Sequence, residues 1–362
     1  MVFVILSATV NNIQPSNHLS IIHKEACQMK YTKLGRSNLE VSRVCLGTMH
    51  FGNRASEEEA FKIMDRALEM GINFFDTANV YGGRGNQGLS EEIIGRWFKA
   101  RPGARDQVVL ATKVYGAMND SGLPNTGGGI SAYKIRMHAA DSLRRLQTDR
   151  IDLYQVHHID TTISVEEFWG AFENLIHHGD VLYIGTSNFP GWGLAKFQVH
   201  AWNRGQIGII SEQSMYNLLC RAPELEVLPA ALELGIGVIP YMPLAGGILT
   251  GKLRSEAGSR TNQVENEYGI SLGEQNKQMA EFSAICREIG EKESVVAIAW
   301  TLAHPAVASP IVGIRTLEQM EGLDRAAELV ISPDALARLN DLFNINRGRA
   351  LRPGPAPQAY AW

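Results

Sequence analysis

Residues 72–81 have the sequence INFFDTANVY. The apolar run at its start ends in the carboxylate of Asp76, and the phenol of Tyr81 follows five residues later. Two other apolar runs also end in a polar side chain: VVLATK ends in Lys113, and IDLYQVH ends in His157. Short apolar runs of this kind, separated by helical segments, are typical of parallel β-strands. The carboxyl ends of parallel strands meet on one side of the sheet, so we expect these four side chains to converge there.

From Met29 onward, runs that resemble strands alternate with amphipathic helical segments, which predicts a parallel α/β fold. Eight strand candidates can be counted, and eight is the number that closes a (β/α)8 TIM barrel. We expect the strands at Arg43–Gly47, Ile72–Asp76, Val108–Lys113, Ile151–His157, Val181–Thr186, Ile207–Gln213, Ile236–Tyr241 and Pro310–Gly313. A β-hairpin around Tyr31–Val41 is expected to precede the barrel.

Serine residues predict where several helices begin. Ser56 and Ser164 each stand three residues before a glutamate and just before an apolar helical periodicity, the pattern of a capping box. The pair Ser332-Pro333 predicts the start of a final helix, because proline is favoured at the first helical position.

The interval between the seventh and eighth strands breaks the regular alternation. Residues 252–277 are polar and lack sustained periodicity, so we interpret them as a long mobile loop. Helices at Met279–Ile289 and Ser294–Ala303 are expected to follow it. We expect residues 1–28 to be a disordered extension or an over-long translation start, and residues 29–362 to form one barrel domain.

Composition excludes several classes of protein. Of the 362 residues, 45% are hydrophobic and 20% are charged. The net charge is −4 and the pI is near 6.2, so no basic surface for nucleic acid or anionic lipid is expected. The apolar start, residues 1–10, lacks basic residues and is too short to span a membrane, although a weak signal-peptide interpretation stays open. Four scattered cysteines fit neither a disulfide framework nor a metal site, which favours a cytoplasmic location.

The four convergent side chains suit the reduction of a carbonyl group. A free phenol has a pKa of about 10 and is a weak acid at neutral pH. The ammonium of Lys113 is expected to lower the pKa of Tyr81, and Asp76 is expected to pair with Lys113 and keep it charged. His157 would hydrogen-bond the substrate oxygen. Each residue alone is more often a cap, a solvated charge or a structural histidine, but together they predict a site where Tyr81 protonates a carbonyl oxygen as a hydride arrives at carbon.

Residues 83–88, GRGNQG, match the GxGxxG pattern of a dinucleotide-binding Rossmann fold. That pattern requires an acidic residue at the end of the next strand, and here the next strand ends in Lys113. The match is therefore weak, and we interpret the glycines as part of a catalytic loop that follows Tyr81.

From Met29 to the C-terminus the chain resembles the aldo-keto reductase superfamily. The resemblance rests on KLGRSNLEVS at residues 33–42, LGTM at 46–49, GTSNF at 185–189 and PLAGGILTGK at 243–252, together with the four convergent side chains. It implies a TIM barrel that binds NADPH without a Rossmann fold, and it implies that Asp76, Tyr81, Lys113 and His157 are catalytic.

The resemblance also implies where the cofactor lies. Ser187, Asn188 and Gln213 would bind the nicotinamide carboxamide, Tyr241 would stack on the nicotinamide ring, and Arg315 would bind the 2′-phosphate. The full set of cofactor-binding residues implied is Thr48, Met49, Asp76, Ser187, Asn188, Gln213, Tyr241, Pro243, Leu244, Gly247, Lys252, Arg260, Gly313, Arg315 and Gln319.

Two departures from the family's pattern involve three positions. Met242 stands where many relatives have a serine that contacts the pyrophosphate. Gly322 and Leu323 stand where relatives often have Glu-Asn near the adenine. We therefore expect two polar adenine contacts to be missing and the preference for NADP to be less strict.

Three functions are compatible with the resemblance, which is strongest to a microbial branch related to the β-subunits of potassium channels. The first is an NADPH-dependent reductase of a small aldehyde or ketone, with Met49, Phe51, Tyr115, Trp192 and the loop 116–130 as candidate pocket residues. The second is an NDP-sugar 2,3-enoyl reductase, although C=C reduction in one branch accompanies a glutamate at the position of His157. The third is a redox-sensing regulatory subunit, and an oligomer is possible in each case.

Overall fold

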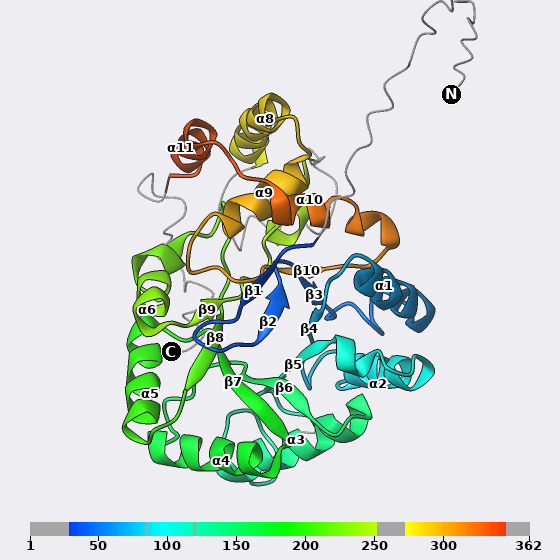
Figure 1. Cartoon of the computed structure of the whole chain (residues 1–362), viewed down its shortest axis with the longest axis vertical. Coiled ribbons are helices and arrows are strands. Elements are labelled where there is room, and N and C mark those ends of the chain that lie inside the picture. The colour runs from blue at the N-terminus through cyan, green and yellow to red at the C-terminus, as the bar shows by residue number, and fades with distance from the viewer. Residues whose placement is uncertain (1–28, 84, 119–120, 252–271, 345–362) are drawn as a thin grey trace, which may run out of the picture.

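The eight predicted parallel strands form one sheet that curls into a barrel (Figure 1). The computed structural model describes residues 29–83, 85–118, 121–251 and 272–344. The sheet order is β10-β3-β4-β5-β6-β7-β8-β9, and a parallel bridge between Tyr241 and Ile311 joins its two edges. The strands are β3 Cys45–Gly47, β4 Phe74–Asp76, β5 Val109–Val114, β6 Ile151–Val156, β7 Val181–Ser187, β8 Ile209–Gln213, β9 Gly237–Val238 and β10 Ile311–Gly313. The prediction of a (β/α)8 barrel is confirmed.

Helices surround the outside of this barrel (Figure 1). They are α1 Glu57–Glu69, α2 Leu89–Ala100, α3 Ala132–Leu146, α4 Val165–His178, α5 Gly191–Asn203, α6 Val227–Leu234, α8 Leu272–Ile289, α9 Glu293–Leu302, α10 Leu323–Glu328 and α11 Pro333–Leu342. No helix in the described segments has both the length and the apolar character needed to cross a membrane.

The serine caps form, with one difference from the prediction. Ser56 makes a complete capping box with Glu59, and the hydroxyl of Ser332 accepts from a backbone N–H of the first turn of α11. At Ser164 only the serine half of the box forms, because the carboxylate of Glu167 accepts a hydrogen bond from the backbone of Ala132 at the start of α3 instead (2.9 Å). This glutamate therefore connects two helices rather than capping its own.

Other boundaries differ by a few residues. Helix α8 begins at Leu272 rather than at Met279, because a formed helix extends at low cost even through a polar segment. The expected loop therefore overlaps this helix, and its remaining residues, 252–271, lie outside the described part of the chain, as do residues 1–28. The strand expected to include His157 ends at Val156.

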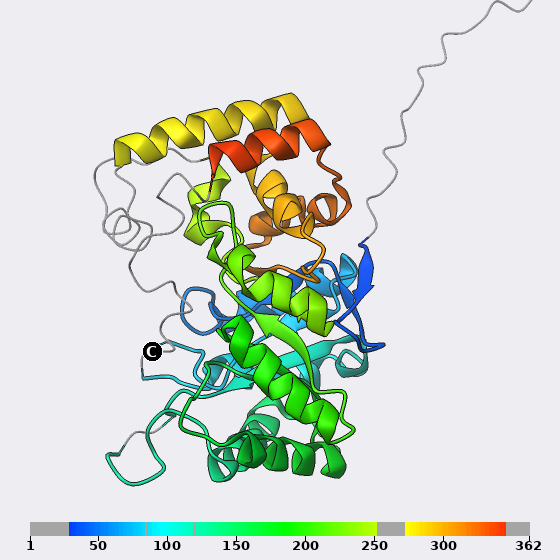
Figure 2. The same ribbon diagram turned by 90° about the vertical axis from the view of Figure 1, so that its left-hand side faces the viewer.

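The predicted hairpin, β1 Tyr31–Lys33 with β2 Glu40–Ser42, closes one end of the barrel. Leu34 and Val41 are fully buried in a cluster with the barrel residues Phe74 and Ile210. Gly35 makes this contact possible, since its φ is 56° and an added Cβ would lie 2.3 Å from the carbonyl oxygen of Ile210. Only glycine adopts such a backbone conformation at no steric cost. Figure 2 shows the hairpin on one side of the barrel, whereas the loop that precedes α3 projects from the opposite side, which is the mouth.

Helices α2 and α3 pack so closely that their contact depends on Gly95. A Cβ there would lie 2.2 Å from the carbonyl oxygen of Arg145 in α3. We therefore expect Gly95→Ala to destabilise the protein by about 1–3 kcal/mol in urea unfolding. The matched control is Gly170→Ala in α4, where an added Cβ meets no atom within 4 Å. That change should stabilise the protein by up to about 1 kcal/mol. Equal stabilities of the two variants would contradict the close packing.

Candidate active site

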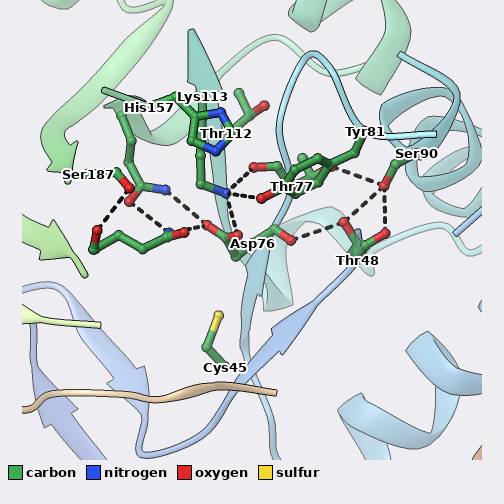
Figure 3. Close-up of polar contacts among 12 residues, drawn as sticks. Cys45, Thr48, Asp76, Thr77, Tyr81, Ser90, Thr112, Lys113, His157 and Ser187 are labelled. Carbon is green, nitrogen blue, oxygen red and sulfur yellow. Dashed lines mark hydrogen bonds and ion pairs between the residues drawn. The ribbon is translucent and has the colours of Figure 1, made fainter. Parts of the chain in front are cut away.

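Asp76 and Lys113 form a buried ion pair at the mouth of the barrel (Figure 3). Asp76 ends β4 and Lys113 lies near the end of the neighbouring strand β5, so both side chains enter the barrel from adjacent strands. The Nζ of Lys113 lies 2.5 Å from Oδ2 of Asp76 and donates also to the carbonyl oxygen of Thr77 (2.8 Å). The exposed fractions of the Lys113 and Asp76 side chains are 0% and 2%, so the pair is sealed from water.

Tyr81 completes this group from the loop after β4. Its hydroxyl oxygen accepts a hydrogen bond from Nζ of Lys113 (3.2 Å). An ammonium only donates hydrogen bonds, so the phenolic hydrogen of Tyr81 is available to another acceptor. The carbonyl oxygen of Tyr81 accepts from the backbone of Gly88 (3.0 Å) and Ser90 (3.2 Å), which ties the loop to the start of α2.

Lys113 lowers the pKa of Tyr81 as expected, but burial outweighs this effect. Burial raises this pKa, and the charge of Asp76 adds to the effect, whereas the charge and hydrogen bond of Lys113 lower it. The net pKa lies above the ordinary value rather than below it, because burial of the phenol outweighs the ammonium. Tyr81 is therefore a protonated phenol at neutral pH.

Asp76 keeps Lys113 charged, as predicted. Burial lowers the pKa of Lys113, but the negative charge of Asp76 and the interaction with Tyr81 outweigh burial and raise it overall. The second oxygen of Asp76, Oδ1, accepts from the side-chain amides of Gln155 (3.0 Å) and Gln213 (2.9 Å). The carboxylate thus has a partner on each oxygen.

His157 faces Tyr81, and His158 faces away from it. The imidazole of His157 packs edge-on against the ring of Tyr81, with 5.9 Å between ring centroids, whereas the ring of His158 packs on Tyr115 at 5.6 Å. Burial, followed by the positive charge of Lys113, lowers the pKa of His157 well below its usual value. This imidazole is therefore neutral at neutral pH and can donate a hydrogen bond without carrying charge.

The residues expected to bind the carboxamide lie together at the ends of β7 and β8. The hydroxyl of Ser187 donates to the carbonyl oxygen of Gln213 (2.8 Å), and the amide of Asn188 donates to the carbonyl oxygen of His157 (3.1 Å). Asn188 also accepts from the hydroxyl of Tyr241 (3.0 Å), whose ring is half-buried beside it. Polar amides, a hydroxyl and one aromatic ring therefore share a single small region.

Thr48 and Met49 lie in the loop after β3, but their environments differ. Thr48 is buried, and its hydroxyl donates to the carbonyl oxygen of Asp76 (3.0 Å) and shares a hydrogen bond with Ser90 (3.0 Å). Its hydroxyl is thus occupied within the protein. Met49, by contrast, is 51% exposed and available to a ligand.

The segment expected to contact the pyrophosphate has an unusual backbone. Met242 and Ala245 have positive φ angles of 54° and 48°, and Gly247 in the 3-10 turn Ala245–Thr250 has a φ of 97°. The backbone N–H groups of Ala245 and Gly247 donate to the carbonyl oxygens of Met242 (2.9 Å) and Leu244 (2.9 Å), so these turns are closed by their own hydrogen bonds. Pro243 is buried and Leu244 half-buried in this segment, whereas Lys252 and Arg260 lie outside the described residues.

The residues expected near the adenosine follow β10. Gly313 is exposed, and the backbone N–H of Arg315 donates to the side-chain oxygen of Gln319 (2.8 Å). Gly322, with a φ of 83°, directly precedes α10, and Leu323 is buried in the core with 4% of its surface exposed. Leu323 is therefore a packing residue and offers no polar contact.

The sequence model of the Aldo/keto reductase family matches residues 43–344. This match covers every described strand of the barrel and all four residues of the group at its mouth. The chain belongs to the aldo/keto reductase family.

Curated members of this family align along nearly their whole length. The oxidoreductase YrpG of Bacillus subtilis is 50% identical over 339 residues, which cover 92% of this chain and 100% of that protein. Aryl-alcohol dehydrogenase [NADP(+)] of Phanerodontia chrysosporium is 32% identical and covers 88% of each chain. Versiconal hemiacetal acetate reductase of Aspergillus parasiticus is 31% identical, covering 90% of this chain and 99% of its own.

Two residues of the site were not found from the sequence. Gln155 lies in β6, two positions before His157, and period-2 alternation along this stretch could have placed it inside the barrel. Ser90 lies in the first turn of α2, where its hydroxyl lies 3.1 Å from that of Thr77 and donates to the carbonyl oxygen of Thr48 (3.0 Å). No short motif marks Ser90, because its partners come from two other loops.

The buried ion pair yields a prediction that does not depend on catalysis. Asp76→Leu leaves the ammonium of Lys113 buried without its counter-charge, and it should lower the free energy of unfolding by about 3–5 kcal/mol. The double variant Asp76→Leu/Lys113→Met removes both charges and should regain most of that loss. Urea unfolding of the two single variants and the double variant forms the required cycle. If the losses of unfolding free energy in the two single variants add up to the loss in the double variant, the two charges do not stabilise one another.

Proposed function

We propose that this protein is an NADPH-dependent reductase that transfers a hydride to the carbonyl carbon of a small aldehyde or ketone. The observation that carries the proposal is the arrangement Asp76–Lys113–Tyr81. Lys113 donates to the oxygen of Tyr81, so the phenol presents its own hydrogen toward the open mouth of the barrel. A phenol held in this way is a proton donor for an oxygen that becomes negative during reduction.

Each residue of the mouth has a distinct part in this chemistry. Tyr81 donates its proton to the carbonyl oxygen, and the charge of Lys113, whose Nζ lies 3.2 Å from the phenol oxygen, stabilises the phenolate that remains. Asp76 holds Lys113 in place. The neutral imidazole of His157, packed against Tyr81, donates a hydrogen bond that orients the same carbonyl oxygen. NADPH, when bound, supplies the hydride.

The side chains at the ends of β7 and β8 fit a nicotinamide carboxamide. The Nε2 of Gln213 is committed to Asp76 and Gln155, so its Oε1 is the atom left to accept from the carboxamide nitrogen. Ser187 and Asn188 add a hydroxyl and an amide beside it. The same glutamine thus connects the proposed cofactor site to the carboxylate that holds Lys113.

Carbonyl reduction is favoured over reduction of a conjugated C=C bond. His157 stands beside Tyr81 where the enoyl-reducing branch is expected to have a glutamate, and its imidazole is neutral. The names of two relatives, aryl-alcohol dehydrogenase [NADP(+)] and versiconal hemiacetal acetate reductase, support this choice, and the first also supports NADP. We also propose a cytoplasmic location, which is supported by the free, buried thiols of Cys45, Cys220 and Cys286.

Replacing Tyr81 by phenylalanine tests the proposed function. Tyr81→Phe removes the proton donor but keeps the ring, so turnover of an aldehyde should fall by at least ~10²-fold while NADPH binding stays nearly unchanged. Turnover is followed by NADPH absorbance over a panel of aldehydes, ketones, enones and sugar nucleotides. The control is Tyr31→Phe in the hairpin at the other end of the barrel, which should keep full turnover. Near-normal turnover by Tyr81→Phe would exclude Tyr81 as the donor.

Arg315 is proposed to select NADPH over NADH. A charge-assisted contact with the 2′-phosphate predicts that Arg315→Ala weakens NADPH binding by roughly 1.5–3 kcal/mol and leaves NADH binding little changed. The control is Arg325→Ala in α10, whose guanidinium pairs with Glu291. Titrating both cofactors by protein fluorescence decides the point. An equal loss for NADH and NADPH would mean that Arg315 is structural, with Lys252 or Arg260 as the next candidates.

A further inference from the structure

Glu212 is a fully buried acid without a positive partner. It lies in β8 directly before Gln213, and because successive strand residues face opposite ways, it faces the outside of the barrel while Gln213 faces the inside. Its carboxyl accepts from the hydroxyls of Thr186 (2.5 Å) and Ser214 (2.8 Å) and from the backbone N–H of Phe189 (3.1 Å). Among the described residues no lysine, arginine or histidine pairs with it.

The hydrogen-bond partners of Glu212 are neighbours of the residues that are proposed to contact the nicotinamide. Thr186 directly precedes the dipeptide Ser187-Asn188, and Phe189 directly follows it, so one carboxyl holds both ends of that dipeptide. Its third partner, Ser214, follows Gln213 along the chain. The carbonyl oxygen of Ser214 in turn accepts from the backbone N–H of Tyr241 (3.0 Å). Three of the four residues proposed to contact the nicotinamide are therefore next in the chain to a partner of Glu212. The fourth, Tyr241, is hydrogen-bonded to one of these partners.

The conformation of Asn188 explains why the dipeptide needs such support. Asn188 has a φ of 56°, which lies in the left-handed region. Residues with a Cβ seldom adopt this conformation, and they keep it only where the surroundings hold them. Its backbone N–H donates to the carbonyl oxygen of Gln213 (3.0 Å), and Phe189 after it is fully buried. Loss of the acceptor for Phe189 N–H would free the segment to return to a common conformation.

The chemistry of Glu212 suits a neutral hydrogen-bonding group. Burial raises its pKa to about 8, so the carboxyl is mostly protonated at neutral pH. In that form its O–H donates to the hydroxyl of Thr186, which can donate in turn to the carbonyl oxygen of Ser211 (3.4 Å). A glutamine has the same shape, retains an oxygen that can accept from Phe189 and Ser214, and has an amide that can donate to Thr186. A leucine fills similar space but offers no hydrogen bond.

We propose that Glu212 is a positioning residue that sets the geometry of the nicotinamide end of the cofactor site through Ser187, Asn188, Gln213 and Tyr241. The inference rests on the proposed function and extends it to a side chain that does not touch the cofactor. Binding of the nicotinamide end of the cofactor should therefore depend on Glu212, whereas binding of the adenosine end, at the residues after β10, should not.

The test compares two ligands on two variants. Glu212→Leu should weaken NADPH binding at least about tenfold, the change that follows from about 1.4 kcal/mol. Binding of adenosine 2′,5′-bisphosphate, which is the adenosine end of NADPH alone, should be unchanged. Glu212→Gln should keep both affinities within about threefold of wild type. Dissociation constants come from protein fluorescence titration, and urea unfolding records the stability of each variant.

Asp152→Asn is the matched control. Asp152 is also a buried strand carboxyl, but it pairs with Arg105 and accepts from the backbone of Leu110 away from the mouth, so its replacement should leave both affinities unchanged whatever it does to stability. If Glu212→Leu does not fold, Thr186→Val removes one hydroxyl partner of Glu212 and should weaken NADPH binding alone.

The outcomes separate the two proposals. Equal losses of both ligands in Glu212→Leu, or a loss of NADPH in Glu212→Gln as large as in the leucine variant, would overturn the positioning role. Normal NADPH affinity in a folded Glu212→Leu protein would also overturn it and leave the proposed reductase function intact. A wild-type protein that does not bind NADPH would overturn both.

Discussion

The rest of the site depends on the burial of the Asp76–Lys113 ion pair. Moving two charges out of water costs several kcal/mol for each ion, and the attraction between them offsets this cost only where further hydrogen bonds satisfy their remaining atoms. The barrel provides these bonds: Thr77 accepts from the ammonium, and two glutamine amides donate to the carboxylate. A pair held in this way keeps Lys113 charged and fixed at 3.2 Å from Tyr81.

The same requirement connects the proposed proton donor to the proposed cofactor site. Asp76 accepts from Lys113 on one oxygen and from Gln213 on the other. Gln213 therefore has its amide orientation set by the ion pair, because only its nitrogen can donate to a carboxylate. A change at Asp76 would alter the pKa of Lys113. It would also alter the orientation of the Gln213 amide, whose oxygen is proposed to accept from the carboxamide. This coupling is a consequence of placing both functions on the inner faces of the barrel strands.

Much of this arrangement could be predicted from the sequence, and the failures have physical causes. Strand-end residues such as Asp76 and Lys113 are predictable, because apolar runs mark parallel strands and parallel strands end together. The lowering effect of Lys113 on the pKa of Tyr81 was predicted, but the net rise was not, because the charge of Lys113 is visible in the sequence and the burial of the phenol is not. Ser90 was missed because its partners belong to other loops, and the early start of α8 was missed because its first turn is polar.

The polar residues on the outer faces of the strands have a different part from those on the inner faces. In β5, Lys113 points into the barrel, whereas Thr112 points outward and donates to the buried carboxyl of Glu91 (2.5 Å), which also pairs with Arg145 (2.7 Å). In β8, Gln213 points inward and Glu212 points outward. Because strand residues alternate, the inward polar groups Lys113 and Gln213 each have an outward polar neighbour that is anchored by buried hydrogen bonds. The inner faces can thus present groups with incomplete hydrogen bonding to a ligand, while the outer faces keep the strand ends rigid.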